Sequence, residues 1–542
     1  MSEETLYNQS HQSHQSVIFV DTLSALQQAI SGPSKRIIIR KSLSGVPNLK
    51  LQRGTTISGV EPNISLSFLP GVDGLEVSED NTIASIKLVV QPNRKAIYNS
   101  YNSRSLGKCR LNNVEAIGQV QILAKGKLSS GRLYIDNLNI IFADTIAQPE
   151  RPSTGTTPEA TNIDVLQGAL TILNLQNDSK SVIEIEARGI NIGTNEQPVY
   201  GSGILISGAD GNIYTNPGST IGGRVEISVL ETGNIYNDSR IALGTSSLIS
   251  GSVFVAYADA KLIVNSGKTV SYGVNGLGLD NWGRVEQWIC IAPVETYGVS
   301  GIGVVNYGYI KHLSVATIET FGSGARTYNV LSGSVENTYL GWVRTHADGA
   351  TGILIRKPIG RLVVNGDIET FGSEAESLSS GHIYLQPSCG LRFEGGSAKE
   401  VLIGGNIITR GQSSPAVQLD NSKIKKLRII GRVWTNGSKS IAFNITDSEI
   451  PLSDIEVSSS LAEAILLQNA RLSEFVGTRA HGAVGDLVVQ TNSRVVTTAG
   501  NVEQLSSQFG NSFAISGAGS LTLVALGLTE VESITTTESE DS

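Results

Sequence analysis

The chain has 542 residues and combines 40% hydrophobic residues and 59 glycines with only 17% charged and 6% aromatic residues. This length exceeds what one globular core holds, and glycine destabilises helix interiors, so the composition favours a repeat of short strands and tight turns. The net charge is −8 and no basic stripe is present, which argues against nucleic acid as a partner.

Residues 1–15 are rich in Gln, Ser and His, and they lack the basic start and apolar stretch of a signal peptide. We expect a disordered tail here. The protein is then cytoplasmic or exported by a non-classical route, with an extracellular surface location as the alternative. No segment approaches the run of about 18 apolar residues that a membrane-spanning helix needs, so no membrane span is expected.

A short helix is predicted next. Asp21 or Thr22 can cap its start, and Leu23, Leu26 and Ile30 recur on one face before a Gly-Pro pair ends it. That apolar face would cover the open end of a stack of strands.

Strand-like segments then follow at short intervals, and most are bounded by Gly, Pro, Asn or Asp. No helical period lies between them, and parallel strands joined without helices imply a chain that winds upon itself. The first predicted strands are Ile37–Ile39, Leu49–Leu51, Thr55–Ile57, Ile64–Phe68, Leu75–Val77 and Thr82–Leu88.

Residues 148–160 contain three prolines and only one apolar residue, Ala160. We interpret them as a loop inserted between windings, because strand-like segments resume at Ile163.

An internal repeat is the strongest indication of the fold. The motif Val294–Gly298 (VETYG) returns at Ile318–Gly322, Val343–His346 and Ile368–Gly372. The equivalent threonines lie at positions 296, 320, 345, 370, 409 and 435, in steps of 24, 25, 25, 39 and 26 residues. The step of 39 predicts an inserted loop.

Three short strands fit in each step, which makes one triangular winding that buries its inner face by stacking on its neighbours. Residues 16–490 are therefore predicted to form a right-handed parallel β-helix (a β-solenoid), with the helix as N-terminal cap. We expect an irregular C-terminal cap at 491–534 and a disordered acidic tail at 535–542.

The repeat also predicts an outward row of side chains. If Val294 and Thr296 point inward, their neighbours in the motif point outward. Aromatic rings beside carboxylates and an arginine suit an extended sugar chain, so these residues are candidates for polysaccharide binding. Alternatively the row is structural, because like residues stack in every solenoid and an arginine neutralises two carboxylates. The row comprises Glu295, Tyr297, Glu319, Phe321, Arg344, Glu369 and Phe371.

Thr345–Gly349 (THADG) is the richest polar cluster of the repeat. His346 could act as a general base, with Asp348 orienting it or binding a cation. An ordinary turn is the alternative, because Asp-Gly is common at corners.

Arg356–Arg361 (RKPIGR) fits the R-x-P-x-x-R pattern of pectate lyases, and the opening from Val20 to Gly59 also resembles the start of that superfamily. The coils with "IETFG" and "THADGA" are similar to those of uncharacterised bacterial β-helix proteins. The resemblance implies the same solenoid fold and, for a lyase, that Arg356 abstracts a proton from a uronate. A W-x-D-H segment and a group of aspartates for calcium are absent before Arg356, so calcium is expected only if the lyase hypothesis holds.

Two functional hypotheses remain. The first is a non-catalytic scaffold or recognition protein that binds polysaccharide along the outward row, without cofactor or metal. The second is a polysaccharide lyase or related uronate-acting enzyme that uses Arg356, His346 and a carboxylate such as Glu319, Asp348 or Glu369. The three cysteines are too far apart for a disulfide framework and are interpreted as small core residues.

Overall fold

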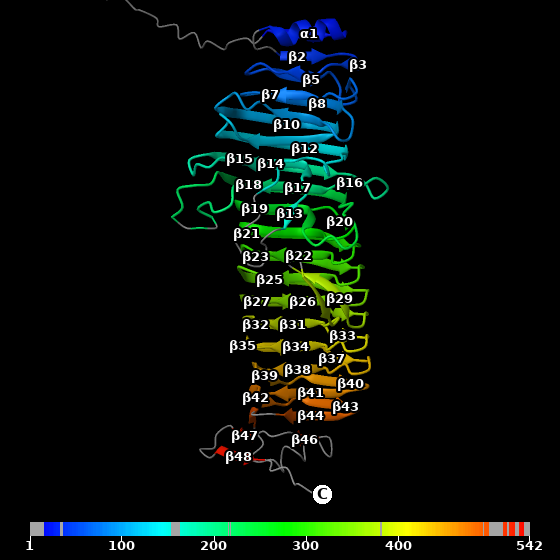
Figure 1. The fold of residues 1–542 in the computed structure, drawn as a ribbon, viewed down its shortest axis with the longest axis vertical. Helices are drawn as coiled ribbons and strands as arrows, with labels where there is room; N and C mark the ends of the chain where they lie inside the picture. Colours follow the sequence, from blue (N-terminus) through cyan, green and yellow to red (C-terminus); the bar gives the residue numbers. More distant parts are fainter. Residues whose placement is uncertain are drawn as a thin grey trace, which may run out of the picture.

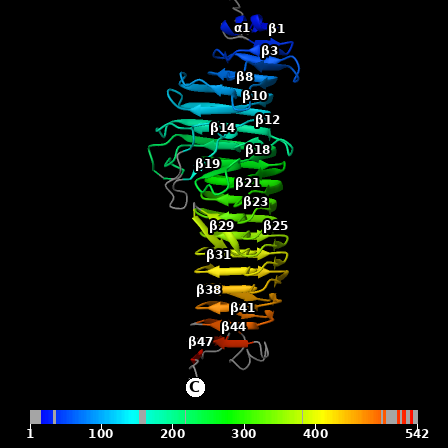
Figure 2. The ribbon, with the colours of Figure 1, turned by 45° about the vertical axis from the view of Figure 1, so that its right-hand side comes forward.

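In the computed structural model the chain is nearly all-β and forms one long column, with α1, the one helix of the described residues, at one end (Figures 1 and 2). The structure describes residues 16–32, 36–152, 163–214, 216, 218–379, 382–490 and 493–497, and the backbone of 513–516, 520–525 and 531–535. The predicted tail at 1–15, part of the loop at 148–160, and the tail beyond Thr535 lie outside the described residues.

The N-terminal half contains α1 and the first nineteen strands. They are β1 (Val17–Val20), α1 (Leu23–Ser31), β2 (Arg36–Ile39), β3 (Leu43–Val46), β4 (Leu49–Lys50), β5 (Thr56–Gly59), β6 (Ser65–Phe68), β7 (Leu75–Val77), β8 (Thr82–Val89), β9 (Lys95–Asn99), β10 (Ser105–Ile117), β11 (Gln119–Ala124), β12 (Ser130–Phe142), β13 (Asp164–Val165), β14 (Gly168–Asn174), β15 (Val182–Ile192), β16 (Val199–Tyr200), β17 (Ser202–Ser207), β18 (Arg224–Asp238) and β19 (Leu248–Asn265).

The remaining strands continue the column. They are β20 (Thr269–Tyr272), β21 (Gly276–Thr296), β22 (Ile302–Asn306), β23 (Tyr309–Thr320), β24 (Arg326–Val330), β25 (Ser334–Thr345), β26 (Thr351–Ile355), β27 (Pro358–Val364), β28 (Ile368–Thr370), β29 (Ala375–Ser379), β30 (His382–Gln386), β31 (Leu391–Glu394), β32 (Ser397–Ile403), β33 (Ile407–Thr409), β34 (Val417–Asp420), β35 (Lys423–Ile424), β36 (Leu427–Ile429), β37 (Arg432–Thr435), β38 (Phe443–Thr446), β39 (Glu449–Ser453), β40 (Glu456–Ser459), β41 (Glu463–Gln468), β42 (Arg471–Val476), β43 (Arg479–Gly482), β44 (Gly485–Gln490), β45 (Arg494–Thr497), β46 (Phe513–Ser516), β47 (Ser520–Ala525) and β48 (Val531–Thr535).

Helix α1 begins and ends as the sequence predicts. The Thr22 hydroxyl accepts a hydrogen bond from the Ala25 amide at 3.3 Å, which caps the start of the helix. Leu26, Ala29 and Ile30 are buried against the first strands. The predicted helix over the end of the stack is therefore confirmed.

Most strands of the column pair in parallel with a strand of the next winding. Strand β21 pairs with β23, β23 with β25, and β25 with β27 and β28, all in parallel. Val294, Ile318, Val343 and Ile368 thereby stack in one buried row, which belongs to a continuous apolar core along the column. This parallel stacking is compatible with a β-solenoid.

The windings differ from the prediction in one respect. Three short strands per winding were expected, but Leu313–Val315 and the strand at Ile318 both lie in the single strand β23. The corner between these two sides keeps an extended backbone, so the ladder runs through it. The burial of the β23 side chains alternates except at residues 311–312 and 316–317, where two successive side chains lie outside the core, as expected where the strand bends.

The long step of the repeat is a hairpin. Strands β29 and β30 pair antiparallel with each other and form a sheet separate from the column. This hairpin falls between Thr370 and Thr409, as the step of 39 residues predicts. Beyond residue 490 the backbone of β46 and β47 still pairs in parallel with β44 and β45, and β48 pairs antiparallel with β47.

Candidate functional site

The threonines of the repeat form one inward row. Thr296, Thr320, Thr345 and Thr370 are directly paired on adjacent strands, and all are fully buried. The hydroxyl of Thr345 donates to the Ala350 carbonyl at 2.9 Å. The predicted adjacency, on which every candidate site depends, is confirmed.

The residue after each threonine carries a ring, and these rings stack on one another. The centroids of Tyr297 and Phe321 lie 4.5 Å apart with an interplanar angle of 5°, and those of Phe321 and His346 lie 4.5 Å apart at 2°. The stack continues to Phe371 at 5.3 Å and, at the other end, to Tyr272 at 5.2 Å. Because each ring covers its neighbour, mainly the ring edges face solvent.

The charged row beside the rings is neutralised along its length. Arg344 lies 3.7 Å from Glu319 and 3.3 Å from Glu369, as the sequence predicts. Lys268 pairs with Glu295 at 2.8 Å, and Arg410 pairs with Glu369 at 2.6 Å.

We call this surface the stacked edge. Its candidate residues are Glu295, Tyr297, Glu319, Phe321, Arg344, His346, Glu369 and Phe371. Glu295 is only 8% exposed, because the Tyr297 hydroxyl and Lys268 cover it. The remaining residues are more accessible, and Tyr297 is 41% exposed.

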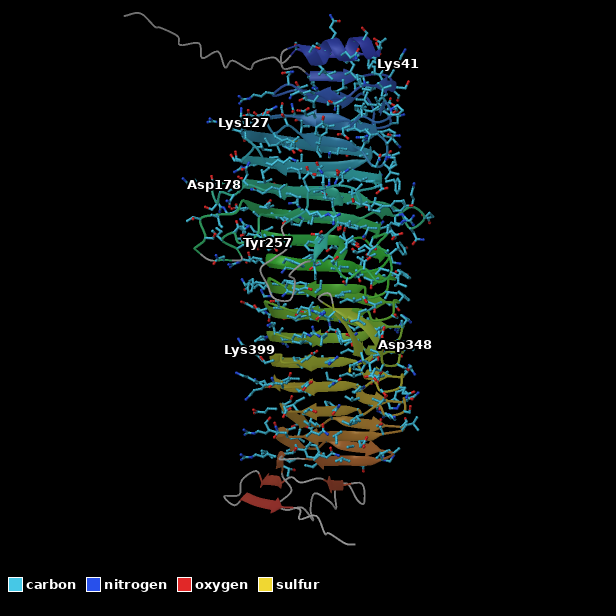
Figure 3. All side chains as sticks on the ribbon, in the orientation of Figure 1. Lys41, Lys127, Asp178, Tyr257, Asp348 and Lys399 are labelled. Carbon is cyan, nitrogen blue, oxygen red and sulfur yellow. The ribbon has the colours of Figure 1, made fainter. Side chains whose placement is uncertain are left out.

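The two candidate catalytic groups of the polar cluster have different partners. The Nε2 atom of His346 lies 2.6 Å from Glu319, and its ring lies between Phe321 and Phe371. Asp348 accepts a hydrogen bond from the Ser373 amide at 2.7 Å and lies at the outer margin of the column (Figure 3). Asp348 therefore fastens the turn of one winding to the next, which is the role of a corner residue.

Arg356 lies beside the inserted hairpin. Its guanidinium donates to Glu394 at 3.2 and 3.3 Å and to the Tyr384 hydroxyl at 3.4 Å. Arg356 and His346 thus contact separate sets of residues, and Arg356 is held in an ion pair with Glu394.

Sequence reasoning missed Trp342, which is 51% exposed on β25. Trp342 and Arg344 are two residues apart in one strand, so both point outward. The indole ring packs against Gly366, where a Cβ atom would come within 2.9 Å of it, and Thr317 is its partner on β23. With small neighbours on both sides, Trp342 is an aromatic side chain of this face that is not part of the ring stack.

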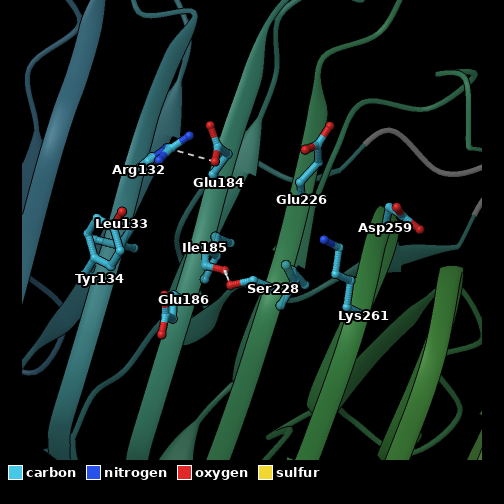
Figure 4. A pocket seen from close by; sticks show the side chains of 11 residues that line it. Arg132, Leu133, Tyr134, Glu184, Ile185, Glu186, Glu226, Ser228, Asp259 and Lys261 are labelled. Carbon is cyan, nitrogen blue, oxygen red and sulfur yellow. Dashed lines mark hydrogen bonds and ion pairs between the residues drawn. The ribbon is translucent and has the colours of Figure 1, made fainter.

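Another row of charged residues borders a shallow depression of about 260 Å³ (Figure 4). Glu184, Glu226 and Asp259 are directly paired on β15, β18 and β19, after Arg132 on β12. Arg132 pairs with Glu184 at 2.8 Å. Burial first, and then Glu226, raise the pKa of Asp259 above its usual value of 3.8, although Arg284 opposes this shift.

The depression brings carboxyl groups together across windings. Paired strands lie about 4.8 Å apart, so residues at the same position of successive windings are direct neighbours. This row has no repeat signal in the sequence, because inserted loops make the windings irregular in length here. Arg132, Arg224 and Arg284 each pair with one of these carboxylates, which is the arrangement of a solvated, ion-paired face.

Asp280 occupies an apolar position on β21. It is directly paired with Phe254 and Val305, it is fully buried, and neither carboxyl oxygen makes a hydrogen bond to the described residues. Burial raises the pKa of Asp280 well above 3.8, although the nearby Trp282 indole opposes this shift.

The three cysteines, Cys109, Cys290 and Cys389, are free and buried, and burial raises the pKa of each thiol to about 12. Their interpretation as small core residues is confirmed. Within the described ranges, no three His, Cys, Asp or Glu side chains are placed to hold a metal ion. In that same part of the chain, the helix lacks the length and apolar character needed to cross a membrane.

Comparison of the chain with models of protein families, with curated proteins and with solved structures finds no match.

Proposed function

We propose that the column is a right-handed parallel β-helix of the pectate-lyase-like kind, and that it acts as a non-catalytic recognition scaffold for polysaccharide along the stacked edge. The proposal depends above all on the state of the candidate catalytic groups: His346, Asp348 and Arg356 are each engaged with a different neighbour. A catalytic constellation needs a base and a charge-stabilising group that converge on one reacting atom.

The stacked edge has the features of a rigid polar surface. Its rings hold one another in place, and its ion pairs leave the outer atoms of Arg344, 41% exposed, available to hydroxyl groups. A sugar would find few free ring faces within the stack, so charged groups and ring edges would provide most of the contacts there.

Trp342 supplies an exposed aromatic side chain for such a ligand. A pyranose ring lying on the indole would place its hydroxyl groups near Arg344, two residues along the same strand. Because neighbouring windings repeat at about 4.8 Å, a linear polysaccharide lying along the column would contact several windings at once.

A glycan array tests the proposal. Trp342→Ala should reduce the signal of bound glycans, and the double variant Tyr297→Ala with Phe321→Ala should reduce it as well. Phe19→Ala is a matched control, because Phe19 is 55% exposed on β1, away from the stacked edge. Binding that is unchanged in both variants, or no binding to any glycan, would contradict the proposal.

The alternative function, a polysaccharide lyase or related uronate-acting enzyme, is tested separately. Incubation with uronate polymers, with and without calcium, is followed by the absorbance of unsaturated products. We expect no product. Activity that Arg356→Ala abolishes would overturn the scaffold proposal in favour of the lyase.

A further inference from the structure

Arginine side chains gather beneath the inserted hairpin β29–β30. Arg326 on β24 is fully buried and donates to Ser377 at 2.8 Å and to the Tyr384 hydroxyl at 2.6 Å, both on the hairpin. Arg356, which follows β26, reaches the same hydroxyl at 3.4 Å. Arg392 on β31 belongs to the same group, because it shares Glu394 with Arg356.

Two arginines of this group share one carboxylate. Arg356 and Arg392 approach one and the same oxygen of Glu394, Oε2, at 3.2 and 3.5 Å. Two guanidinium groups therefore share one carboxylate, and a buried charge without an equal counter-charge is costly.

Several buried polar atoms here also have unused hydrogen-bonding capacity. The Nε and Nη1 atoms of Arg392 are buried and make no hydrogen bond to the described residues, and the same holds for both amide atoms of Asn329. Asn329, Leu354 and Arg392 occupy directly paired positions on the adjacent strands β24, β26 and β31, so Leu354 lies between the other two. Buried donors of this kind usually have a partner, such as a bound water or ion.

Tyr384 reports the electrostatic character of the cluster. Burial alone would raise its pKa, but Arg326 and Arg356, with a smaller contribution from Arg392, outweigh burial, and the net pKa lies below 10.0. The cluster thus favours negative charge even on a phenol.

The hairpin is attached to the column differently from the way in which the windings are attached to one another. Its two strands pair only with each other within the described structure, and side-chain contacts such as those of Arg326 and Gln386 attach it to the column. Arg356 and Glu394 lie at the solvent side of the cluster, with side chains 23% and 36% exposed.

We propose that a compact oxyanion, either a phosphate or a carboxylate group, binds between the hairpin β29–β30 and the sheet face that carries Arg392. The guanidinium groups of Arg392 and Arg356 match the oxygen spacing of both groups, and a bound anion would accept a hydrogen bond from Nε or from Nη1 of Arg392, which lie on different edges of its guanidinium. The site is separate from the stacked edge and does not depend on the proposed glycan binding.

Isothermal titration calorimetry with inorganic phosphate and with acetate, at constant ionic strength set by chloride, tests this inference. We expect saturable binding of at least one of the two anions, and the comparison identifies whether the site prefers the tetrahedral or the planar group. Arg392→Gln and Arg356→Gln should each weaken binding about tenfold or more, because each removes a charge-assisted hydrogen bond.

Arg432→Gln is the matched control. Arg432 also pairs with a glutamate, Glu456 at 3.1 Å, but on windings beyond the hairpin, so this change should leave anion affinity unaltered. Arg356 is more exposed than Arg392, so its variant keeps the test valid if Arg392→Gln fails to fold. Equal heats of anion binding in the wild type and in Arg356→Gln, or no saturable heat with either anion, would overturn the inference. The arginines would then only attach the hairpin to the column.

Discussion

Replacement of Asp280 by asparagine should change how the stability of the protein depends on pH. The buried carboxyl group binds its proton in the folded state, whereas in the unfolded chain it loses the proton above about pH 3.8. Folding therefore takes up one proton in this range. The free energy of unfolding of the wild type should fall as pH rises from 3.8 towards the raised pKa of the folded state.

One proton corresponds to about 1.4 kcal/mol per pH unit. Asparagine has nearly the shape of the protonated carboxyl group but does not titrate. The unfolding free energy of Asp280→Asn minus that of the wild type should therefore increase by about 1.4 kcal/mol per pH unit between pH 3.8 and the raised pKa of the folded state. Below pH 3.8 the difference in unfolding free energy between the two proteins should vary little with pH.

Urea unfolding, followed by both circular dichroism and tryptophan fluorescence, measures this difference, and agreement of the two probes shows that the same transition is followed. Asp280→Val should abolish the extra slope as well, because the slope belongs to the carboxyl group. A difference between wild type and Asp280→Asn that does not vary with pH would refute the reasoning and would mean that Asp280 is solvated or paired.

Other predictions concern the rows of the column and its thiols. Thr409→Val and Thr435→Val should each destabilise the protein by about 1 kcal/mol, because their hydroxyls donate to the Ser414 and Ser440 carbonyls. Thr296→Val and Thr320→Val should be neutral or stabilising, because those buried hydroxyls have no partner among the described residues. The midpoints of urea unfolding distinguish the two pairs of variants. Phe321→Ala should lower the free energy of unfolding by about 1 to 3 kcal/mol, because Phe321 makes two stacking contacts. An unchanged midpoint of urea unfolding would contradict this prediction. Arg344→Ala should cost less than about 1 kcal/mol in the same assay and less still at high salt, since Arg344 is 41% exposed; a larger, salt-independent loss would refute a surface ion pair. The three thiols should react with Ellman's reagent far more slowly in the folded protein than in urea, and rapid labelling of the folded protein would show that the thiols are accessible to solvent.

The sequence predicted the parts of the molecule in which neighbouring windings have equal lengths. Thr296, Thr320, Thr345 and Thr370 recur at nearly constant spacing because they occupy equivalent positions in adjacent strands. The same spacing located the hairpin as an interruption of the period. The neutralising role of Arg344 also followed from register alone.

Features that depend on irregular windings or on insertions could not be predicted in this way. Arg410 reaches Glu369 across the step that contains the hairpin, so the two are far apart in sequence. Tyr384 and Arg392 carry no repeat signal, because one lies in the insertion and the other directly after it. Arg356 was singled out by a local pattern, yet its surroundings are set by the hairpin that the pattern does not contain.

Helix α1 bears on how separate molecules behave towards one another. A stack of parallel strands ends in a row of unsatisfied backbone groups, onto which a second copy could add its own strands and begin a fibre. Leu26, Ala29 and Ile30 hold α1 over the first strands, which closes that end sterically. The column can therefore be built from parallel strands of similar geometry without end-to-end polymerisation at its N-terminal end.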